Sequence, residues 1–339
     1  MTAATPSATT PRSTDRFRQW WRSSKIPPVW GFVVIIFLLS IVLDLLFGVD
    51  DQLFITNPVI LANILVRSVA LGIVAVGQTF VMIGASIDLS VAYMISVTAV
   101  GGSFLMAGDP ANVWWTVIVL MAVGAFVGLI NGLLITRLKI NPLIATLGIG
   151  LILKGLLNAA FENFAGSVPR SFQSFAYDSI GPLPISVLVL FAVVVAGWFI
   201  LRRTKYGAHL YSVGGNQEVA RLSGVRTGRV LIIAHIICSM TAVLTGLFVV
   251  SRLRSGAPWV GTDGLYDLES IAAVVVGGTA LSGGKGGVWG TLGGVLIFSL
   301  LDTMFNQIGI DAYMKQILRG AIIILAVGFY TYRSVGEPS

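Results

Sequence analysis

Residues 71–100 read LGIVAVGQTFVMIGASIDLSVAYMISVTAV, in which two apolar runs are separated by the polar segment GASIDLS at 84–90. A helix that crosses a bilayer needs about 20 mostly apolar residues. Each run, extended to its flanks, therefore predicts a membrane-spanning helix. Asp88 lies between the runs, where we expect the helix to be broken. Exposed backbone groups within a membrane are tolerated only inside protein or beside a cavity, so this stretch indicates a polytopic membrane fold.

The composition of the whole chain agrees with this interpretation. Of 339 residues, 55% are hydrophobic and 11% are charged, and the mean hydropathy is +0.88. Soluble domains typically carry roughly 25% charged residues. The net charge of +7 does not indicate nucleic-acid binding, because the basic residues lie in short gaps between apolar runs. The single cysteine, Cys238, cannot form an internal disulfide.

The apolar runs predict an all-α integral membrane protein with about ten transmembrane helices. The eighth candidate is short and interrupted by glycine. Glycines four residues apart predict close helix–helix contacts, as at Gly124, Gly128 and Gly132 and again at Gly290 and Gly294. The ten candidate spans are 29–47, 60–83, 89–106, 113–134, 142–160, 185–201, 230–250, 268–281, 288–304 and 314–331.

The distribution of Lys and Arg sets the orientation, because cytoplasmic loops of membrane proteins are enriched in both. With both termini in the cytoplasm, only Arg170, Arg252 and Arg254 lie in external loops. Spans two to five then start outside and spans seven to ten start inside, so the halves are predicted to be inverted. The predicted divisions are a cytoplasmic leader with an interfacial anchor (1–28), one transmembrane domain (29–331) with a cytoplasmic loop at 202–229, and a cytoplasmic tail (332–339).

The cytoplasmic loop 202–229 contains signals for a short helix. Gly214 and Gly215 end one element, Asn216 is a good N-cap, and the helix continues through Leu222. Gly224 can end it in a left-handed conformation. Such a helix could fit a groove on a partner and pass rigid-body motion into the membrane. The alternative is a stiff basic connector held by anionic lipid.

Four segments in order resemble the permeases of carbohydrate-uptake ABC importers, which serve ribose, xylose, arabinose, galactose and related solutes. The similarity covers about residues 60 to 330. Ser86 and Ala92 stand where that family usually has glycine, and Leu143 where phenylalanine is common. The segments are GASIDLSV (Gly84–Val91), NGLLITRLKINPLIATLG (Asn131–Gly148), LESIAAVVVGGTALSGGKGGVWGTLGG (Leu268–Gly294) and the pattern GGNxxxAxxSG formed by Gly214, Gly215, Asn216, Ala220, Ser223 and Gly224.

This resemblance implies a bacterial inner-membrane permease whose helix at 214–224 couples to a separate cytoplasmic ATPase. It also implies an external solute-binding protein, docked on residues 161–184 and 251–267, and a second permease, identical or paralogous. ATP and Mg²⁺ would be bound by the ATPase. The segment GGTALSGGKGG is not a P-loop, since Thr279 occupies the first glycine position and Gly286 follows Lys285. We therefore expect no catalytic residue and no cofactor in this chain.

The candidate solute pathway centres on Asp88, because an ionised carboxylate in a membrane is costly unless it is solvated or paired. The alternative role for Asp88 is to cap the next helix by accepting from the N–H groups of residues 90 and 91. Neutral hydrogen-bonding side chains suit a polyol, although interhelical hydrogen bonds are an alternative for each. The other candidates are Gln78, Thr79, Ser90, Asn131 and Thr146.

The remaining charged residues are interpreted as architecture. Asp302 is expected to pair with Lys315 or Arg319, and Glu269 to favour a helix N-terminus. With only two histidines, His209 and His235, no metal site is expected. Two other functions stay open: an ion-coupled secondary transporter, and a permease of the same machinery for a nucleoside, a furanone or a branched-chain amino acid.

Overall fold

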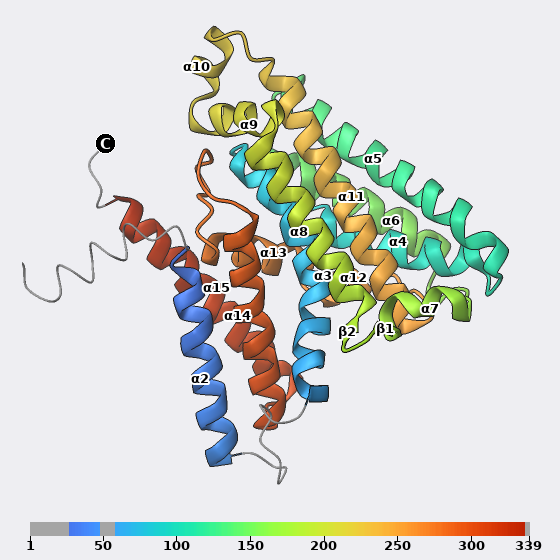
Figure 1. Cartoon of the computed structure of the whole chain (residues 1–339). Helices are drawn as coiled ribbons and strands as arrows, with labels where there is room; N and C mark the ends of the chain where they lie inside the picture. The colour runs from blue at the N-terminus through green and yellow to red at the C-terminus, as the bar shows by residue number, and fades with distance from the viewer. Residues whose placement is uncertain (1–26, 48–57, 336–339) are drawn as a thin grey trace, which may run out of the picture.

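The computed structural model describes residues 27–47 and 58–335, which form a helical bundle (Figure 1). Most of the predicted leader, 1–28, and residues 336–339 of the predicted tail lie outside the described residues. Each predicted span coincides with a helix to within a few residues at most ends. These helices are α2 (Val29–Phe47), α3 (Pro58–Ile83), α4 (Val91–Met106), α5 (Val113–Thr136), α6 (Pro142–Ala160), α8 (Ile185–Arg203), α11 (Thr227–Leu253), α13 (Tyr266–Val276), α14 (Val288–Gln307) and α15 (Ala312–Val335).

Six helical segments in the described ranges are long and apolar enough to cross a membrane by themselves. The chain is therefore a helical membrane protein, whereas the number of ten crossings, the cytoplasmic termini and the inverted halves stay predictions. The six segments are Leu61–Ile83, Pro110–Thr136, Pro142–Ala160, Ile185–Arg203, Thr227–Leu253 and Val288–Gln307.

Helix α13 ends five residues before the end of its predicted span of 268–281. It has 11 residues, which at 1.5 Å per residue give about 16 Å, roughly half the hydrocarbon thickness of a bilayer. The helix ends at Gly277, and Gly278 adopts a left-handed φ of +87°. Helix α13 alone thus cannot cross a membrane.

Helix α11 lies in the middle of the bundle, packed against α3, α4 and α5 (Figure 1). The predicted close approach of α5 is confirmed, since a Cβ added to Gly128 would lie 2.5 Å from the backbone oxygen of His235 and 2.6 Å from Cα of Ile236. Gly132 is in similarly tight contact with Ile232. Small residues on α5 therefore allow two long helices to pack backbone against backbone.

Parts of the two loops predicted to be external form one layer at the opposite end of the bundle from α10 (Gln217–Leu222), as Figure 1 shows. The N–H of Ala165 donates to the oxygen of Gly256 at 2.9 Å, and the N–H of Val168 donates to the oxygen of Arg254 at 3.0 Å. We call residues 161–184 and 251–256 the loop layer. It also holds α7 (Arg170–Tyr177) and the antiparallel pair β1 (Ser179–Ile180) and β2 (Leu183–Pro184), while η2 (Pro110–Asn112) precedes α5.

The prediction that the whole of 251–267 is a surface loop is wrong for its second half. After Gly256, which packs against Ala99, the chain descends along α4 into the bundle as α12 (Val260–Asp263). Gly261 contacts Ala92 and donates its N–H to Oγ of Ser96 at 2.9 Å. From position 99 to 92 the descent is about 10 Å, and the lack of side chains on the two glycines makes this approach possible.

Candidate functional sites

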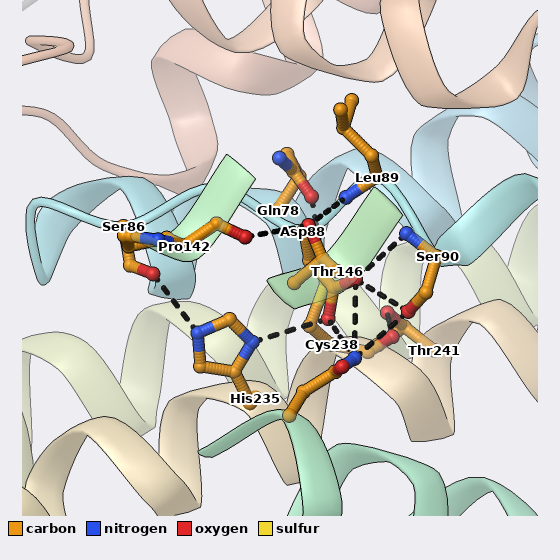
Figure 2. Close-up of polar contacts among 11 residues, drawn as sticks. Gln78, Ser86, Asp88, Leu89, Ser90, Pro142, Thr146, His235, Cys238 and Thr241 are labelled. Carbon is orange, nitrogen blue, oxygen red and sulfur yellow. Dashed lines mark hydrogen bonds and ion pairs between the residues drawn. The ribbon is translucent and has the colours of Figure 1, made fainter. Parts of the chain in front are cut away.

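Asp88 lies in the segment between α3 and α4, and its carboxylate accepts hydrogen bonds from several parts of the chain (Figure 2). Its carboxylate accepts from the N–H and Oγ of Ser90 at 2.9 and 2.5 Å. Nδ2 of Asn131 on α5 lies 3.4 Å from Oδ2 of Asp88 and donates to Oγ of Ser90 at 2.9 Å. Nδ1 of His235 on α11 lies 3.1 Å from Oδ2. The capping interaction predicted for Asp88 is confirmed at residue 90.

The backbone around Asp88 is held by two more of the predicted residues. The Gln78 amide lies 3.2 Å from both the N and the O of Asp88, so its nitrogen can donate to the carbonyl while its oxygen accepts from the N–H. Oγ1 of Thr146 on α6 accepts from the N–H of Leu89 at 3.0 Å. Side chains from α3 and α6 thereby satisfy backbone groups of a segment that belongs to no helix, as burial within a membrane protein requires.

His235 was not predicted as a partner of Asp88, because 147 residues separate the two in sequence. A carboxylate only accepts hydrogen bonds, so Nδ1 of His235 donates to Asp88. Nε2 of the same ring lies 2.9 Å from Oγ of Ser86. The ring thus joins two residues of the broken segment, Ser86 and Asp88, to α11. No local sequence signal identifies this contact.

We call Gln78, Asp88, Ser90, Asn131, Thr146 and His235 the Asp88 network. All six side chains are fully buried. None of them lines either of the two described cavities, of about 630 and 700 Å³. The network therefore holds helices together in this conformation, and its role in the solute pathway stays a prediction.

Thr79 lies apart from the Asp88 network. Its Oγ1 donates to the oxygen of Ala75 and is 2.7 Å from Oγ1 of Thr291 on α14. Adjacent residues on a helix point about 100° apart, so Gln78 and Thr79 meet different neighbours. Gln78 and Thr79 thus lie at two different helix interfaces.

The predicted cytoplasmic helix is present as α10 (Gln217–Leu222). Oδ1 of Asn216 accepts from the N–H of Val219 at 3.0 Å, and Gly224 has a φ of +84°, as the capping pattern predicts. Ala220 is buried, whereas Val219 and Leu222 are 57% and 78% exposed. Helix α10 therefore presents apolar side chains outward at one end of the molecule.

Helix α9 (Lys205–Gly215) connects α10 to the bundle. A Cβ at Gly214 would collide with the backbone oxygen of Ile83 and lie 2.6 Å from the N of Gly284. The N–H of Gly284 in turn donates to the oxygen of Ile83 at 2.9 Å. The end of α9, the end of α3 and the segment 277–287 thus touch through backbone atoms.

Tyr211 adds a side-chain contact to this junction. Its hydroxyl donates to the oxygen of Gly286 at 2.8 Å. Burial raises the pKa of Tyr211 above its usual value, and the nearby Arg202 only partly opposes this. The hydroxyl therefore stays protonated at neutral pH and keeps donating to the segment 277–287.

A second charged cluster joins α3, α13, α14 and α15. Asp302 pairs with Arg319, as predicted, and also with Arg67 at 3.0 Å. Arg319 reaches Glu269 at 3.0 Å. Lys315 does not pair with Asp302 and instead donates to Oδ1 of Asn306 at 2.6 Å. We call Arg67, Glu269, Asp302 and Arg319 the Asp302 cluster. The ion pairs of Arg67 and Glu269 were not predicted, because their partners are distant in sequence.

Comparison of the sequence with known proteins finds a matching family and several relatives. Residues 60–327 match the family described as the permease component of branched-chain amino acid transport systems. The chain is 37% identical over 275 residues to the ribose import permease protein RbsC of Escherichia coli, covering 79% of this chain and 84% of the relative. It is 32% identical over 316 residues to the galactose/methyl galactoside import permease protein MglC of Escherichia coli, covering 87% and 91%.

A further relative is the ribose import permease protein RbsC of Bacillus subtilis, 32% identical over 309 residues, covering 89% of this chain and 91% of the relative. No solved structure matches the chain.

Proposed function

Because the chain belongs to this family of permease components, we propose that it is the membrane-spanning subunit of an ATP-binding-cassette importer for a monosaccharide. The solute would be a pentose- or hexose-like polyol. The relatives that align with this chain over most of their length are named ribose and galactose import permeases. Transport would proceed by alternating access in the bacterial cytoplasmic membrane.

The observation that carries this proposal is the exposed, capped helix α10. Val219 and Leu222 offer an apolar surface that a cytoplasmic ATPase can cover. That separate polypeptide would bind ATP and Mg²⁺, so this chain itself would need neither a cofactor nor a catalytic or metal-binding residue. The coupling residues are Gly214, Gly215, Asn216, Ala220, Ser223 and Gly224.

The contacts of α9 support a transmission role for this region. Backbone contact between Gly214 and Ile83 leaves little room for α9 and α10 to move independently of α3. Gly283 also packs closely against Ala85, the second residue of the broken segment, with 2.7 Å between an added Cβ at Gly283 and Cβ of Ala85. A displacement of α10 would therefore reach the segments 84–90 and 277–287 together, and with them the Asp88 network.

On the opposite face, the loop layer is the proposed docking surface for an external solute-binding protein. Ring contacts stiffen this surface: Arg254 lies over the ring of Tyr177 with 5.4 Å between the guanidinium carbon and the ring centroid, and Phe164 packs edge-on against Trp259. A second permease, identical or paralogous, would complete the translocation path. Gln78, Thr79, Asp88, Ser90, Asn131 and Thr146 stay candidates for shaping that path.

The test is uptake by membrane vesicles that contain the full chain together with the proposed partner ATPase and solute-binding protein. Radiolabelled D-ribose and D-galactose should accumulate only when ATP is supplied on the cytoplasmic side of the vesicle membrane. L-Leucine is the competing solute, because the family description names branched-chain amino acids. Accumulation of leucine but not of sugar would reject the sugar assignment, and sugar uptake without the ATPase would establish a secondary transporter.

A substitution separates docking from folding. A side chain at Gly215 meets nothing within 4 Å in this chain, so Gly215→Trp should insert normally and yet abolish ATP-dependent uptake by blocking the ATPase. The matched control is Gly155→Trp on α6, where an added side chain likewise meets nothing within 4 Å in this chain. Normal uptake by Gly215→Trp would refute the docking role.

A further inference from the structure

The Asp302 cluster lies on the wall of a cavity of about 630 Å³. This volume falls within the range of small-molecule sites, which are mostly apolar with a few convergent polar groups. The walls come from α3, α11, α12, α13, α14 and α15. Six aromatic rings line the cavity, those of Phe164, Phe248, Trp259, Tyr266, Phe298 and Phe305.

The cavity lies between the ends of the bundle. Asp302 is 14 residues beyond the start of α14 at Val288, or about 21 Å along the helix. Arg67 is 16 residues before the end of α3 at Ile83, or about 24 Å. Both of those helix ends lie at the junction with α9, whereas Asp302 is only five residues from the opposite end of α14 at Gln307, or about 7 Å. The charges therefore lie inside the bundle but nearer to the end opposite the junction. Ionisable groups within membrane-spanning helices are costly and usually functional.

The charges around the cavity compensate one another. Three arginines, Arg67, Arg252 and Arg319, face three carboxylates, those of Asp263, Glu269 and Asp302. The formal sum is zero, so the cavity has no net charge with which to attract an ion. Guanidinium groups supply only donors and carboxylates only acceptors. A solute that offers hydroxyl groups, each a donor and an acceptor, can use both kinds.

The half-length helix α13 supports a role in transport. It starts at Tyr266, on the cavity wall, directly after the inward-turning segment α12. Interrupted helices near the middle of the membrane form the substrate sites of many transporters. The break between α12 and α13 thus lies where a solute could meet both aromatic and charged groups.

We propose that this cavity is a binding site for a neutral polyol of monosaccharide size, and that Glu269, Asp302, Arg67 and Arg319 bind its hydroxyl groups while the aromatic rings cover its apolar faces. The Asp88 network would not touch the solute in this conformation. This inference names a solute site for the proposed importer and therefore rests on the proposed function.

The test is protection of an introduced cysteine in the full chain within the importer complex. The only native cysteine, Cys238, is fully buried. Leu301→Cys places a thiol on the cavity wall. Tyr313→Cys, on the first turn of α15 at a position that is 81% exposed, places one outside the cavity. Vesicles would be treated with a membrane-impermeant methanethiosulfonate reagent, with D-ribose or D-galactose present or absent.

Sugar at ten times its dissociation constant should slow the labelling of Leu301→Cys about tenfold and leave that of Tyr313→Cys unchanged. Glu269→Gln should shift the protecting sugar concentration upward without changing the unprotected labelling rate. Equal labelling with and without sugar, or no labelling of Leu301→Cys, would overturn the site. Stronger protection by L-leucine or sodium glutamate would overturn the neutral-polyol class.

Uptake by the complex without any substitution keeps the two failures distinct. Sugar uptake combined with absent protection rejects only the site. Absent sugar uptake rejects the proposed function itself.

Discussion

The Asp88 network and the Asp302 cluster both place carboxylates inside the bundle, but they differ in what surrounds them. Asp88 and His235 are fully buried, whereas the side chains of Asp302 and Arg319 are 21% and 25% exposed and border a cavity. A charged side chain inside a membrane protein is not by itself evidence of a solute site, because it can be held there by its partners alone. Whether it can meet a solute depends on the space beside it.

The packing of neighbouring helices explains this difference. Near Asp88, Gly128 and Gly132 bring α5 against α11, and no room remains. Beside the Asp302 cluster, the large rings of Tyr266, Phe298 and Phe305 line a cavity of about 630 Å³. Close-packed small residues exclude solutes, while aromatic rings can form the walls of a site.

Removal of the Asp88 carboxylate should have the largest effect on stability. Asp88→Ala leaves Nδ1 of His235 and the N–H of Ser90 without their acceptor, and each buried donor left unsatisfied costs about 1–3 kcal/mol. Unfolding of the detergent-purified chain by increasing SDS measures this loss. Asp88→Asn preserves the shape and is the control, expected to lose less. An alanine variant as stable as the parent would show that the network is not structural.

Gly128→Leu should have the next largest effect, because its side chain would overlap the backbone of His235 and Ile236. Overpacking of this kind costs about 1–3 kcal/mol. Gly148→Leu on α6 is the matched control, since a side chain there meets nothing within 4 Å in this chain. The same SDS titration compares the two. Equal stability of both variants would mean that α5 and α11 are not tightly packed at the network.

Arg67→Gln should change stability least. Arg67 is 40% exposed, and Asp302 keeps its pair with Arg319. A solvent-screened pair of this kind contributes about 0–1 kcal/mol. The variant should nevertheless raise the sugar concentration that protects Leu301→Cys. A large stability loss with unchanged protection would make the Asp302 cluster architectural, like the Asp88 network.

The positions of the helices could be predicted from the sequence with good accuracy. Span length and apolarity located α2 and α6 with the observed ends. Local capping chemistry also predicted the ends of α10, because Asn216 and Gly224 act on their immediate neighbours. Such features depend on short stretches of chain.

Features that depend on tertiary contacts could not be predicted. The pairing of His235 with Asp88 and of Arg67 with Asp302 joins residues more than a hundred positions apart. The descent of α12 was missed for a related reason, since the role of Gly256 and Gly261 becomes visible only beside α4. The family resemblance indicated the transporter class but not where a cavity opens.

The 11 residues of α13 have a consequence for how the protein is made. A segment that covers about half the bilayer gains too little from lipid to insert alone as it leaves the ribosome. Its apolar residues Ala272 to Val275 are buried against Leu71, Ala75 and Phe298 of α3 and α14. Since α14 is synthesised after α13, biogenesis must hold α13 back until α14 has emerged, and the two enter the membrane as a hairpin against the earlier helix α3.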